Sequence, residues 1–343
     1  MKPIFVGIPT INRPMLVRET IDSVLGQTCR DLRAVVSDNG SEPEAIGSVR
    51  DYIAGLKDDR IEFVAQSRND GEYGQARYFF ARAADFRYFM MVHDDDVLKP
   101  DYVEKGIAKL DSVPEVDVFL ADPYIMDEAG NLSNVDTSKY LADHGRIKAQ
   151  TGPIDVLTKY VMHGFLPISG TMFRRSALER SGFVDSEARG NFPFECDVFL
   201  RLADIGAAAW YQREELLGFR FHRSSMRNYM HLMQNRQVVD DMVGLFSKYR
   251  YRGAVERRRR AILSRLHRAN AVIGLRVRDI ALARSSMVAA LKARAWSPRA
   301  WAMAPFVMLV PRVCSRVLRS PPAAVEAPAY RTSREGRSSP RPP

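Results

Sequence analysis

The sequence predicts an α/β fold with a mostly parallel, doubly wound sheet and a helical extension at the C-terminal end. Three observations lead to this prediction. Apolar runs alternate with stretches of helical period through the first hundred residues, as in successive βαβ units. The run Tyr88–Val92 is apolar throughout, which is typical of a strand buried on both faces of a parallel sheet. From Leu232 onward the pattern is helical and rich in arginine.

The first hundred residues contain short expected strands and the helices that connect them. The strands are residues 4–8, 34–36, 60–65 and 88–92. A stripe that includes Leu16 and Ile21 predicts a helix that starts near Pro14, where proline fits the first turn, and ends at Gly26. Another helix is expected from Gly74 to residue 84, leading into the last of these strands.

Beyond Pro100 we expect further elements and one long loop. The expected helices are residues 102–110, 154–162, 176–181 and 192–203, and the expected strands are residues 116–120, 124–126 and 168–173. Residues 132–152 are polar and have no clear period, so we expect a loop there. A loop of this length in a compact domain is usually a lid or a binding segment.

Charge is distributed unevenly along the chain. The net charge of +10 combines a segment from residue 244 to the end, with 22 basic and 4 acidic residues, and a remainder with 29 basic and 37 acidic residues. The remainder indicates an enzyme body, and the basic segment indicates contact with an anionic surface. We therefore expect a catalytic domain over residues 1–230, a basic helical extension over 231–319, and a disordered tail over 320–343.

The cysteines and the N-terminus favour a cytoplasmic location. Cys29, Cys196 and Cys314 are far apart and have neither disulfide nor zinc spacing, which favours a reducing compartment. The N-terminus leads directly into a strand at Ile4 and lacks the basic and apolar regions of a signal peptide.

Three adjacent carboxylates, Asp94, Asp95 and Asp96, follow directly after the central apolar run. The carboxyl ends of strands in an open α/β sheet are where ligands bind. Like charges held in a cleft repel one another, and a hard divalent cation such as Mn²⁺ or Mg²⁺ removes this cost. The alternative is a solvated acidic turn that caps the helix beginning near Pro100.

Polar loops follow the other expected strands as well. They are Pro9–Arg13, Ser37–Ser41, Arg68–Gly71 and His93–Asp96. Since the ends of parallel strands meet at one edge of the sheet, these loops together predict a nucleotide pocket. The sequence contains neither a Gly-x-Gly-x-x-Gly nor a Gly-Lys-Ser/Thr phosphate loop, which argues against a dinucleotide oxidoreductase and a P-loop ATPase.

Seven short segments, in order, resemble the family 2 glycosyltransferases with the GT-A fold, of the type that builds bacterial cell-surface glycans. They are Ile8–Arg13, Ser23–Thr28, Val36–Ser41, Asn69–Gly71, the acidic run before Val97–Asp101, Gly170–Arg175 and Glu195–Arg201. The resemblance covers residues 3–225. It implies inverting, metal-dependent transfer of a hexosyl or related group from a nucleotide-diphospho sugar to a hydroxyl of a glycan or lipid-linked glycan, in the synthesis of cell-surface polysaccharide or glycolipid.

The resemblance also implies roles for individual residues. It assigns the donor nucleotide to Pro9, Thr10, Asn12, Asp38, Asn69, Arg77 and Asp94. It assigns the metal to Asp95, five residues before the proline of the motif, and places His222 near the diphosphate as a further ligand. His93 stands where the first aspartate of the family's motif is common, and Asp96 is implied to support the ligands from behind.

A carboxylate must also take the proton of the acceptor, because a sugar hydroxyl is a poor nucleophile at neutral pH. The resemblance implies that this base is one of two residues, Glu195 or Asp197, and we favour Glu195. The alternative for Asp197 is a carboxylate at the start of a helix, where the helix dipole stabilises it.

Two other functions are consistent with parts of the sequence. A sugar-nucleotide nucleotidyltransferase shares the nucleotide and the carboxylates, but it usually needs a glycine-rich, basic loop near the N-terminus, and Pro9–Pro14 contains no glycine. A non-catalytic nucleic-acid binder would use the arginine-rich third. Its aromatic residues, however, lie in an apolar stretch rather than between the basic residues, so we expect no nucleic acid as partner.

The apolar stretch Ala300–Val310 is too short to span a membrane, which takes roughly twenty residues. With the surrounding arginines it predicts that residues 257–319 dock on the cytoplasmic face of the inner membrane, so that the enzyme is peripheral there. The alternative is a helical bundle packed on the catalytic domain, with Trp296, Trp301 and Phe306 in its core.

Overall fold

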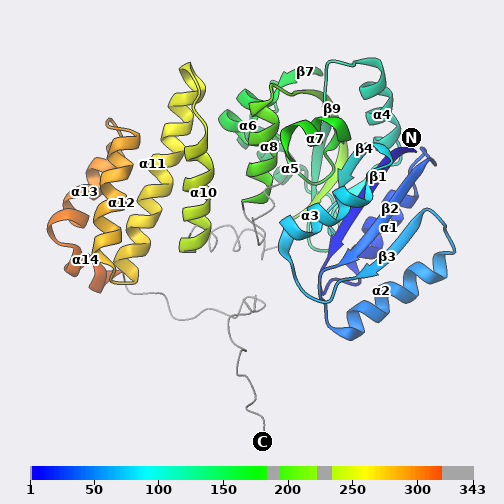
Figure 1. The fold of residues 1–343 in the computed structure, drawn as a ribbon, viewed down its shortest axis with the longest axis horizontal. Coiled ribbons are helices and arrows are strands. Elements are labelled where there is room, and N and C mark those ends of the chain that lie inside the picture. Colours follow the sequence, from blue (N-terminus) through cyan, green and yellow to red (C-terminus); the bar gives the residue numbers. More distant parts are fainter. Residues whose placement is uncertain (1, 184–192, 222–233, 319–343) are drawn as a thin grey trace, which may run out of the picture.

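The computed structural model describes residues 2–183, 193–221 and 234–318. Within these residues the chain forms a nine-stranded sheet and, at one side of it, a group of C-terminal helices (Figure 1). The strands lie in the order β3-β2-β1-β4-β8-β6-β9-β5, and β7 pairs with the beginning of β9, residues 208–211.

The N-terminal half of the sheet is parallel, as predicted. Its strands are β1 (Lys2–Thr10), β2 (Leu32–Asp38), β3 (Ile61–Ala65) and β4 (Phe86–Met91). Its connecting helices are α1 (Leu16–Leu25), α2 (Pro43–Leu56) and α3 (Gly71–Arg82). The predicted helix stop at Gly26 is confirmed, since Gly26 caps α1 through hydrogen bonds from its backbone N–H.

The second half of the sheet is mixed. Its strands are β5 (Val97–Leu98), β6 (Val118–Met126), β7 (Gly152–Asp155), β8 (Met172–Arg174) and β9 (Ala208–Arg220). Its helices are α4 (Tyr102–Ser112), α5 (Asn134–Asp143), α6 (Val156–His163), α7 (Arg175–Ser181) and α8 (Phe194–Asp204). β8 runs antiparallel between β4 and β6, whereas β6 and β9 are parallel.

Three sequence predictions in this half are wrong. The two strands expected at 116–120 and 124–126 are the single strand β6, whose register with β9 shifts around Asp122. The loop expected over 132–152 contains α5, which starts at a Ser133 cap that accepts a hydrogen bond from the N–H of Asp136. The strand expected over 168–173 begins only at Met172, because Gly170 has a positive φ of 74°. The long strand β9 was not predicted.

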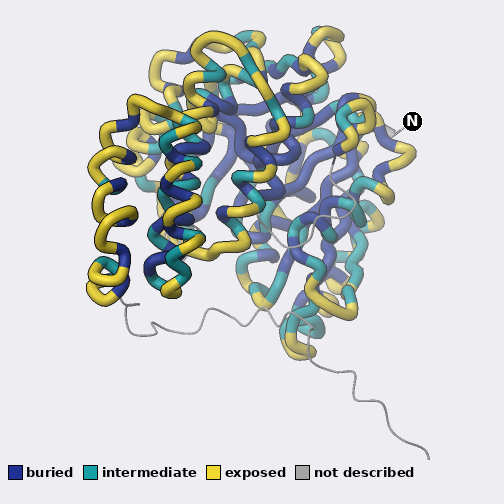
Figure 2. Tube along the Cα trace, turned by 60° about the vertical axis from the view of Figure 1, so that its left-hand side comes forward, coloured by how far each residue is buried: buried dark blue, intermediate teal, exposed yellow. Residues whose placement is uncertain are grey.

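Alternate residues of β1 face two separate apolar layers. Ile4 and Val6 pack with α1, α2 and α4 on one side of the sheet, whereas Phe5 packs with α3, α6 and α8 on the other. Figure 2 shows that the strands of the sheet are buried along most of their length. The central strand β4 is buried on both faces, as its apolar sequence predicts.

The C-terminal helices are α10 (Arg236–Lys248), α11 (Gly253–Arg276), α12 (Ile280–Ala293), α13 (Pro298–Leu309) and α14 (Pro311–Val317). The first two share the core of the body, because Phe246, Leu263 and Leu266 belong to the same buried cluster as Tyr160 of α6. The later helices have a small core of their own around Met287. Among the described residues, every helix is too short or too polar to cross a membrane.

Three aromatic residues of this region lie outside both cores. Trp296 is 90% exposed, Trp301 58% and Phe306 60%. The alternative expectation is therefore right in that the first of these helices pack on the body, and wrong in that the three aromatic residues do not form the core. The predicted domain boundary near residue 230 stays a prediction, and the predicted disordered tail, 320–343, lies outside the described residues.

The close packing of α3 on β1 gives a first testable prediction. A Cβ atom on Gly7 would lie 2.5 Å from Cγ of Phe79, a buried ring. We expect Gly7→Ala to lower the free energy of unfolding by about 1–3 kcal/mol through overpacking. Gly47 of α2 is the matched control: nothing lies within 4 Å of its added Cβ, so Gly47→Ala should raise stability by about 0.5–1 kcal/mol. Urea unfolding of both variants measures this, and equal effects would contradict it.

Candidate active site

The ends of β1, β2 and β4 meet at one edge of the sheet and are joined by hydrogen bonds. The N–H of Asn39, just after β2, donates to the carbonyl of Thr10, the last residue of β1, at 2.8 Å. The hydroxyl of Thr10 in turn donates to Asp94 Oδ2 at 2.8 Å. The predicted loops therefore converge on one site.

The loop after β1 presents a guanidinium group to the acidic run. Asn12 has a left-handed backbone, with φ at 53°, and is fixed by a hydrogen bond from its N–H to Ser41 Oγ at 2.8 Å. The next residue, Arg13, reaches Asp94 at 3.0 Å and Asp95 at 2.9 Å through the same nitrogen. Its side chain is 39% exposed, so this cation lies at the mouth of the site.

The predicted nucleotide-binding residues after β2 and β3 form a second hydrogen-bonded group. Asp38 accepts from the N–H groups of Gly40 and Ser41, at 3.1 and 2.8 Å, and so holds the loop in shape. Asn39 donates to the side chain of Asn69 at 2.9 Å. Pro9 lies next to Thr10 at the end of β1, and Arg77 lies half-buried farther along α3.

The acidic run gathers three potential ligand atoms. Those of His93, Asp95 and Asp96 all lie within 4.8 Å of one another. Asp96 is buried and accepts hydrogen bonds from Ser169 Oγ at 2.6 Å and from the N–H of Arg220 at 3.2 Å. Burial, and then the charge of Asp95, raise the pKa of Asp96. A divalent cation fits this donor set for two reasons. Carboxylates and an imidazole are suitable ligands for such ions, and a cation would offset the repulsion between the neighbouring carboxylates.

A buried arginine, Arg220, holds the backbone and side chains of this cluster in position. The side chain of Arg220 is 1% exposed, donates to the backbone carbonyl of Asp95 at 3.2 Å and forms an ion pair with Glu19. Since Arg220 ends β9, the long strand that the sequence did not reveal fixes the position of the acidic run. His222, the other predicted metal ligand, lies outside the described residues.

His93 is hydrogen-bonded to an acidic residue that the sequence did not single out. Its Nε2 lies 3.1 Å from Oε1 of Glu72, in the first turn of α3. Burial disfavours the charged imidazolium, but the hydrogen bond with Glu72 and the charges of Asp96 and Asp95 outweigh it and raise the pKa of His93 to about 10. Binding of a cation by His93 would release this proton, because a ligating imidazole must be neutral.

Glu195 and Asp197 lie on different sides of α8. Glu195 faces the site: it accepts a hydrogen bond from the N–H of Ile168 at 3.2 Å. Burial, and the charge of Glu72, raise its pKa to about 7, although the bond from Ile168 opposes this. Asp197 is buried and forms an ion pair with Arg201 at 2.9 Å. It lies near Tyr249, whose pKa is raised by burial and then by the charge of Asp197.

Comparison with known proteins identifies the family. Residues 5–182, more than half of the chain, match the family model described as glycosyl transferase family 2. The chain belongs to glycosyl transferase family 2. The resemblance found in its sequence motifs is therefore confirmed.

Individual relatives of this family member are distant. An uncharacterized glycosyltransferase of Methanocaldococcus jannaschii is 30% identical over 129 residues, which are 37% of this chain and 43% of that protein. The chain thus spans less than half of the length of that curated relative. A crystal structure of S. aureus TarS (1–349) has a TM-score of 0.59 at 14% identity and covers 92% of this chain and 88% of its own.

The same part of TarS in complex with UDP-GlcNAc has a TM-score of 0.58 at 14% identity, over 92% of this chain and 89% of that one. At this level of identity the likeness concerns the fold. The predicted GT-A fold, with its mostly parallel central sheet and C-terminal helices, is confirmed for this glycosyltransferase.

Several residues of the site were missed by sequence reasoning. They are Arg13, Glu72, Ser169 and Arg220. Arg13 is the last residue of the motif Ile8–Arg13, although no role was assigned to it, and Glu72 directly follows the motif Asn69–Gly71, so position in the chain was an available signal. Ser169 and Arg220 are more than 70 residues away from Asp96, at 73 and 124 positions, and only the folded sheet brings them together.

The raised pKa of Glu195 predicts a pH-dependent contribution to stability in this glycosyltransferase. Its carboxyl ionises near pH 7 in the folded state instead of near 4.5, so the folded enzyme should lose up to about 3 kcal/mol as the pH rises through this window. Glu195→Gln removes the ionisation and should abolish that loss. Urea unfolding at pH 5 and pH 8 measures the difference. Parallel pH dependence in the two proteins would contradict the prediction.

Proposed function

We propose that this glycosyltransferase moves a sugar from a nucleotide-diphospho sugar to a hydroxyl acceptor, with Mn²⁺ or Mg²⁺ and with inversion at the anomeric carbon. The proposal rests on one observation: the candidate cation cluster of His93, Asp95 and Asp96 lies at the same edge of the sheet as Glu195, whose pKa is raised. Glu72 connects them, because it hydrogen-bonds His93 and its charge acts on Glu195.

The donor is proposed to lie over the ends of β1 and β2. Residues that line this position are Pro9, Thr10, Asn12, Asp38, Asn69, Arg77 and Asp94. The hydrogen bonds within this group hold the loops in place, and loops that are already ordered need little further ordering on binding. The complex of TarS with UDP-GlcNAc supports a nucleotide sugar as the class of donor.

Asp95 is proposed to hold the cation together with His93 and Asp96, and His222 is a further candidate ligand. When bound, the cation would supply positive charge against the leaving diphosphate. The chain adds positive charge of its own, because Arg13 places a guanidinium beside Asp94 and Asp95. Arg220 keeps the backbone of Asp95 in position.

Glu195 is proposed as the general base. The acceptor oxygen forms a bond to the anomeric carbon, the bond from that carbon to the diphosphate breaks, and the acceptor proton passes to Glu195. A pKa of about 7 suits a base that works near neutral pH. Asp197 is instead bound to Arg201 on the other side of α8, where it stabilises the helix.

The acceptor is proposed to be a glycan or a lipid-linked glycan of the cell surface, reached from the cytoplasmic face of the inner membrane. A nucleotidyltransferase is not favoured, because the chain belongs to a glycosyltransferase family. Hydrolysis of UDP-, GDP- and dTDP-sugars in the presence of Mn²⁺ tests the proposal directly. Release of the nucleoside diphosphate from one of them would support it, and release of a nucleoside monophosphate would contradict it.

Removal of the Asp95 carboxylate should separate cation binding from folding. We expect Asp95→Ala to lose the Mn²⁺-dependent part of UDP binding and at least a hundredfold in donor turnover, while its circular dichroism is unchanged. Glu179→Ala is the control, since this exposed carboxylate pairs with its helix neighbour Arg175 in α7, away from the acidic run. Isothermal titration calorimetry with UDP, with Mn²⁺ or with a chelator, measures the effect. Unchanged Mn²⁺ dependence in Asp95→Ala would sink the proposal.

Replacement of each of the two carboxylates on α8 by its amide tests the assignment of the base. Glu195→Gln should keep donor binding and lose at least about a hundredfold in kcat, the usual contribution of a general base. In the wild type, kcat should rise with pH to a plateau above about pH 7, because the base must be ionised. Asp197→Asn should mainly lower the free energy of unfolding and have a small effect on kcat. An active Glu195→Gln beside an inactive Asp197→Asn would reverse the assignment.

A further inference from the structure

The last helices carry large apolar side chains on the outside and small ones inside. In α13, Ala300, Ala304 and Val307 are buried against the neighbouring helices. Several large apolar side chains of residues 296–317 are instead exposed. They are Trp296, Trp301, Phe306, Met308, Leu309, Val310, Val313 and Val317. A surface helix of a globular protein has the opposite arrangement. We call these eight residues the terminal apolar face, and so many exposed large apolar side chains within one segment indicate an interaction site.

A group of arginines adjoins this face. Burial, and then the charges of Arg299, Arg265 and Arg294, lower the pKa of Arg268. Each of these three guanidinium groups therefore lies close enough to Arg268 for its charge to act there. The Nε atom of Arg268 is buried without a hydrogen-bond partner in the described part of the chain. Arg294 and Arg299 flank Trp296 in the sequence, so the arginine group, Arg265, Arg268, Arg294 and Arg299, is continuous with the apolar face.

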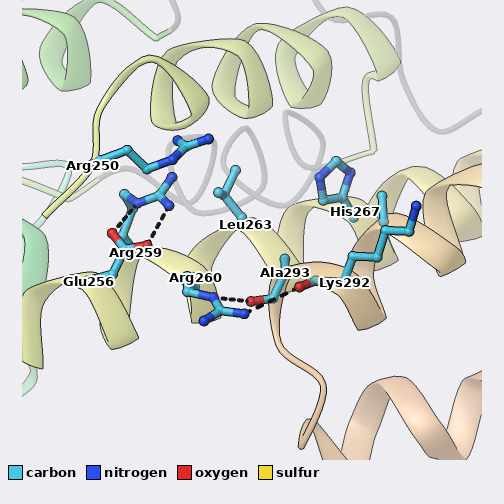
Figure 3. A pocket seen from close by; sticks show the side chains of 9 residues that line it. Arg250, Glu256, Arg259, Arg260, Leu263, His267, Lys292 and Ala293 are labelled. Atoms are coloured by element: carbon cyan, nitrogen blue, oxygen red, sulfur yellow. Dashed lines mark hydrogen bonds and ion pairs between the residues drawn. The ribbon is translucent and has the colours of Figure 1, made fainter. Parts of the chain in front are cut away.

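Positive charge extends farther along α11 and α12. A hollow of about 450 Å³ between these helices and the end of α10 is lined by basic side chains (Figure 3). Arg259 is neutralised there by Glu256 at 2.7 Å, whereas Arg260 is bonded to the carbonyl groups that end α12. Arg250 and Lys292 add two more cations to the same hollow. The chain leaves α12 at this point and continues directly into Arg294 and Trp296.

We propose that the terminal apolar face and the arginine group together dock the enzyme on an anionic lipid bilayer. The aromatic side chains would enter the headgroup region, where Trp is favoured, and the arginines would contact lipid phosphates. A bilayer fits better than a protein partner, because one occupant satisfies both the exposed apolar side chains and the neighbouring arginines. This inference rests on the proposed function for its cytoplasmic orientation, but not for the binding itself.

Flotation of the full-length protein with vesicles tests the inference. The full chain is needed, because α10 and α11 share the core of the body and a truncation would uncover it. We expect binding to vesicles of phosphatidylcholine and phosphatidylglycerol in equal parts, and at least tenfold weaker binding to phosphatidylcholine alone. A triple variant, Trp296→Ser with Trp301→Ser and Phe306→Ser, should lose at least tenfold in binding to the anionic vesicles.

Two further variants distinguish the contributions. Arg294→Gln with Arg299→Gln should weaken binding to anionic vesicles and leave binding to phosphatidylcholine unchanged. Val135→Ser is the matched control, since Val135 is 80% exposed but lies on α5, in the body. It should bind like the wild type. Equal vesicle binding by the wild type and the triple variant would overturn the inference.

Other occupants of the face give other results. A wild-type dimer in light scattering that the triple variant abolishes, without vesicle binding, would overturn the bilayer in favour of a second copy of the chain. Binding of duplex DNA that displaces the vesicles would overturn it in favour of nucleic acid. Hydrolysis of sugar nucleotides in solution, measured on the same proteins, should be unchanged in the triple variant. Vesicle binding by a protein without that hydrolysis would instead count against the proposed function alone.

Discussion

Three consecutive carboxylates at the end of a buried strand are the constraint on which the structure depends. Each must be stabilised in a site that water only partly reaches, and Asp94 and Asp96 have different partners. Asp94 is bound by Thr10 and by the exposed Arg13, whereas Asp96 is bound by Ser169 and by the backbone of Arg220. The mixed part of the sheet supplies these partners from distant parts of the chain, because Ser169 lies just before β8 and Arg220 ends β9.

The two arginines beside the acidic run have different surroundings. Arg220 is almost completely buried and is bonded on several sides, so its charge is a permanent part of the fold. Arg13 is partly exposed and is attached through one nitrogen to two carboxylates. The acidic run therefore has one buried cationic partner, Arg220, and one partly exposed cationic partner, Arg13.

Local patterns in the sequence sufficed for β1 to β4, because each is a short apolar run between turns. They failed where a partner is distant. Asp122 and Pro123 interrupt the apolar pattern of β6, and the burial of Asp122 is possible only because Arg146 and Tyr211 bind it from far along the chain. Helix α5 is polar, and its sole local signal was the Ser133 cap. The loops of the site were predictable because they follow strands, whereas Arg220 belongs to a strand that alternates between buried and exposed positions.

The helices α10 and α11 close the apolar layer that lies over α6 and α8, although they belong to the last third of the chain. During synthesis this layer therefore remains uncovered until residues near Ile273 have left the ribosome. Completion of this core therefore waits for the C-terminal third of the chain.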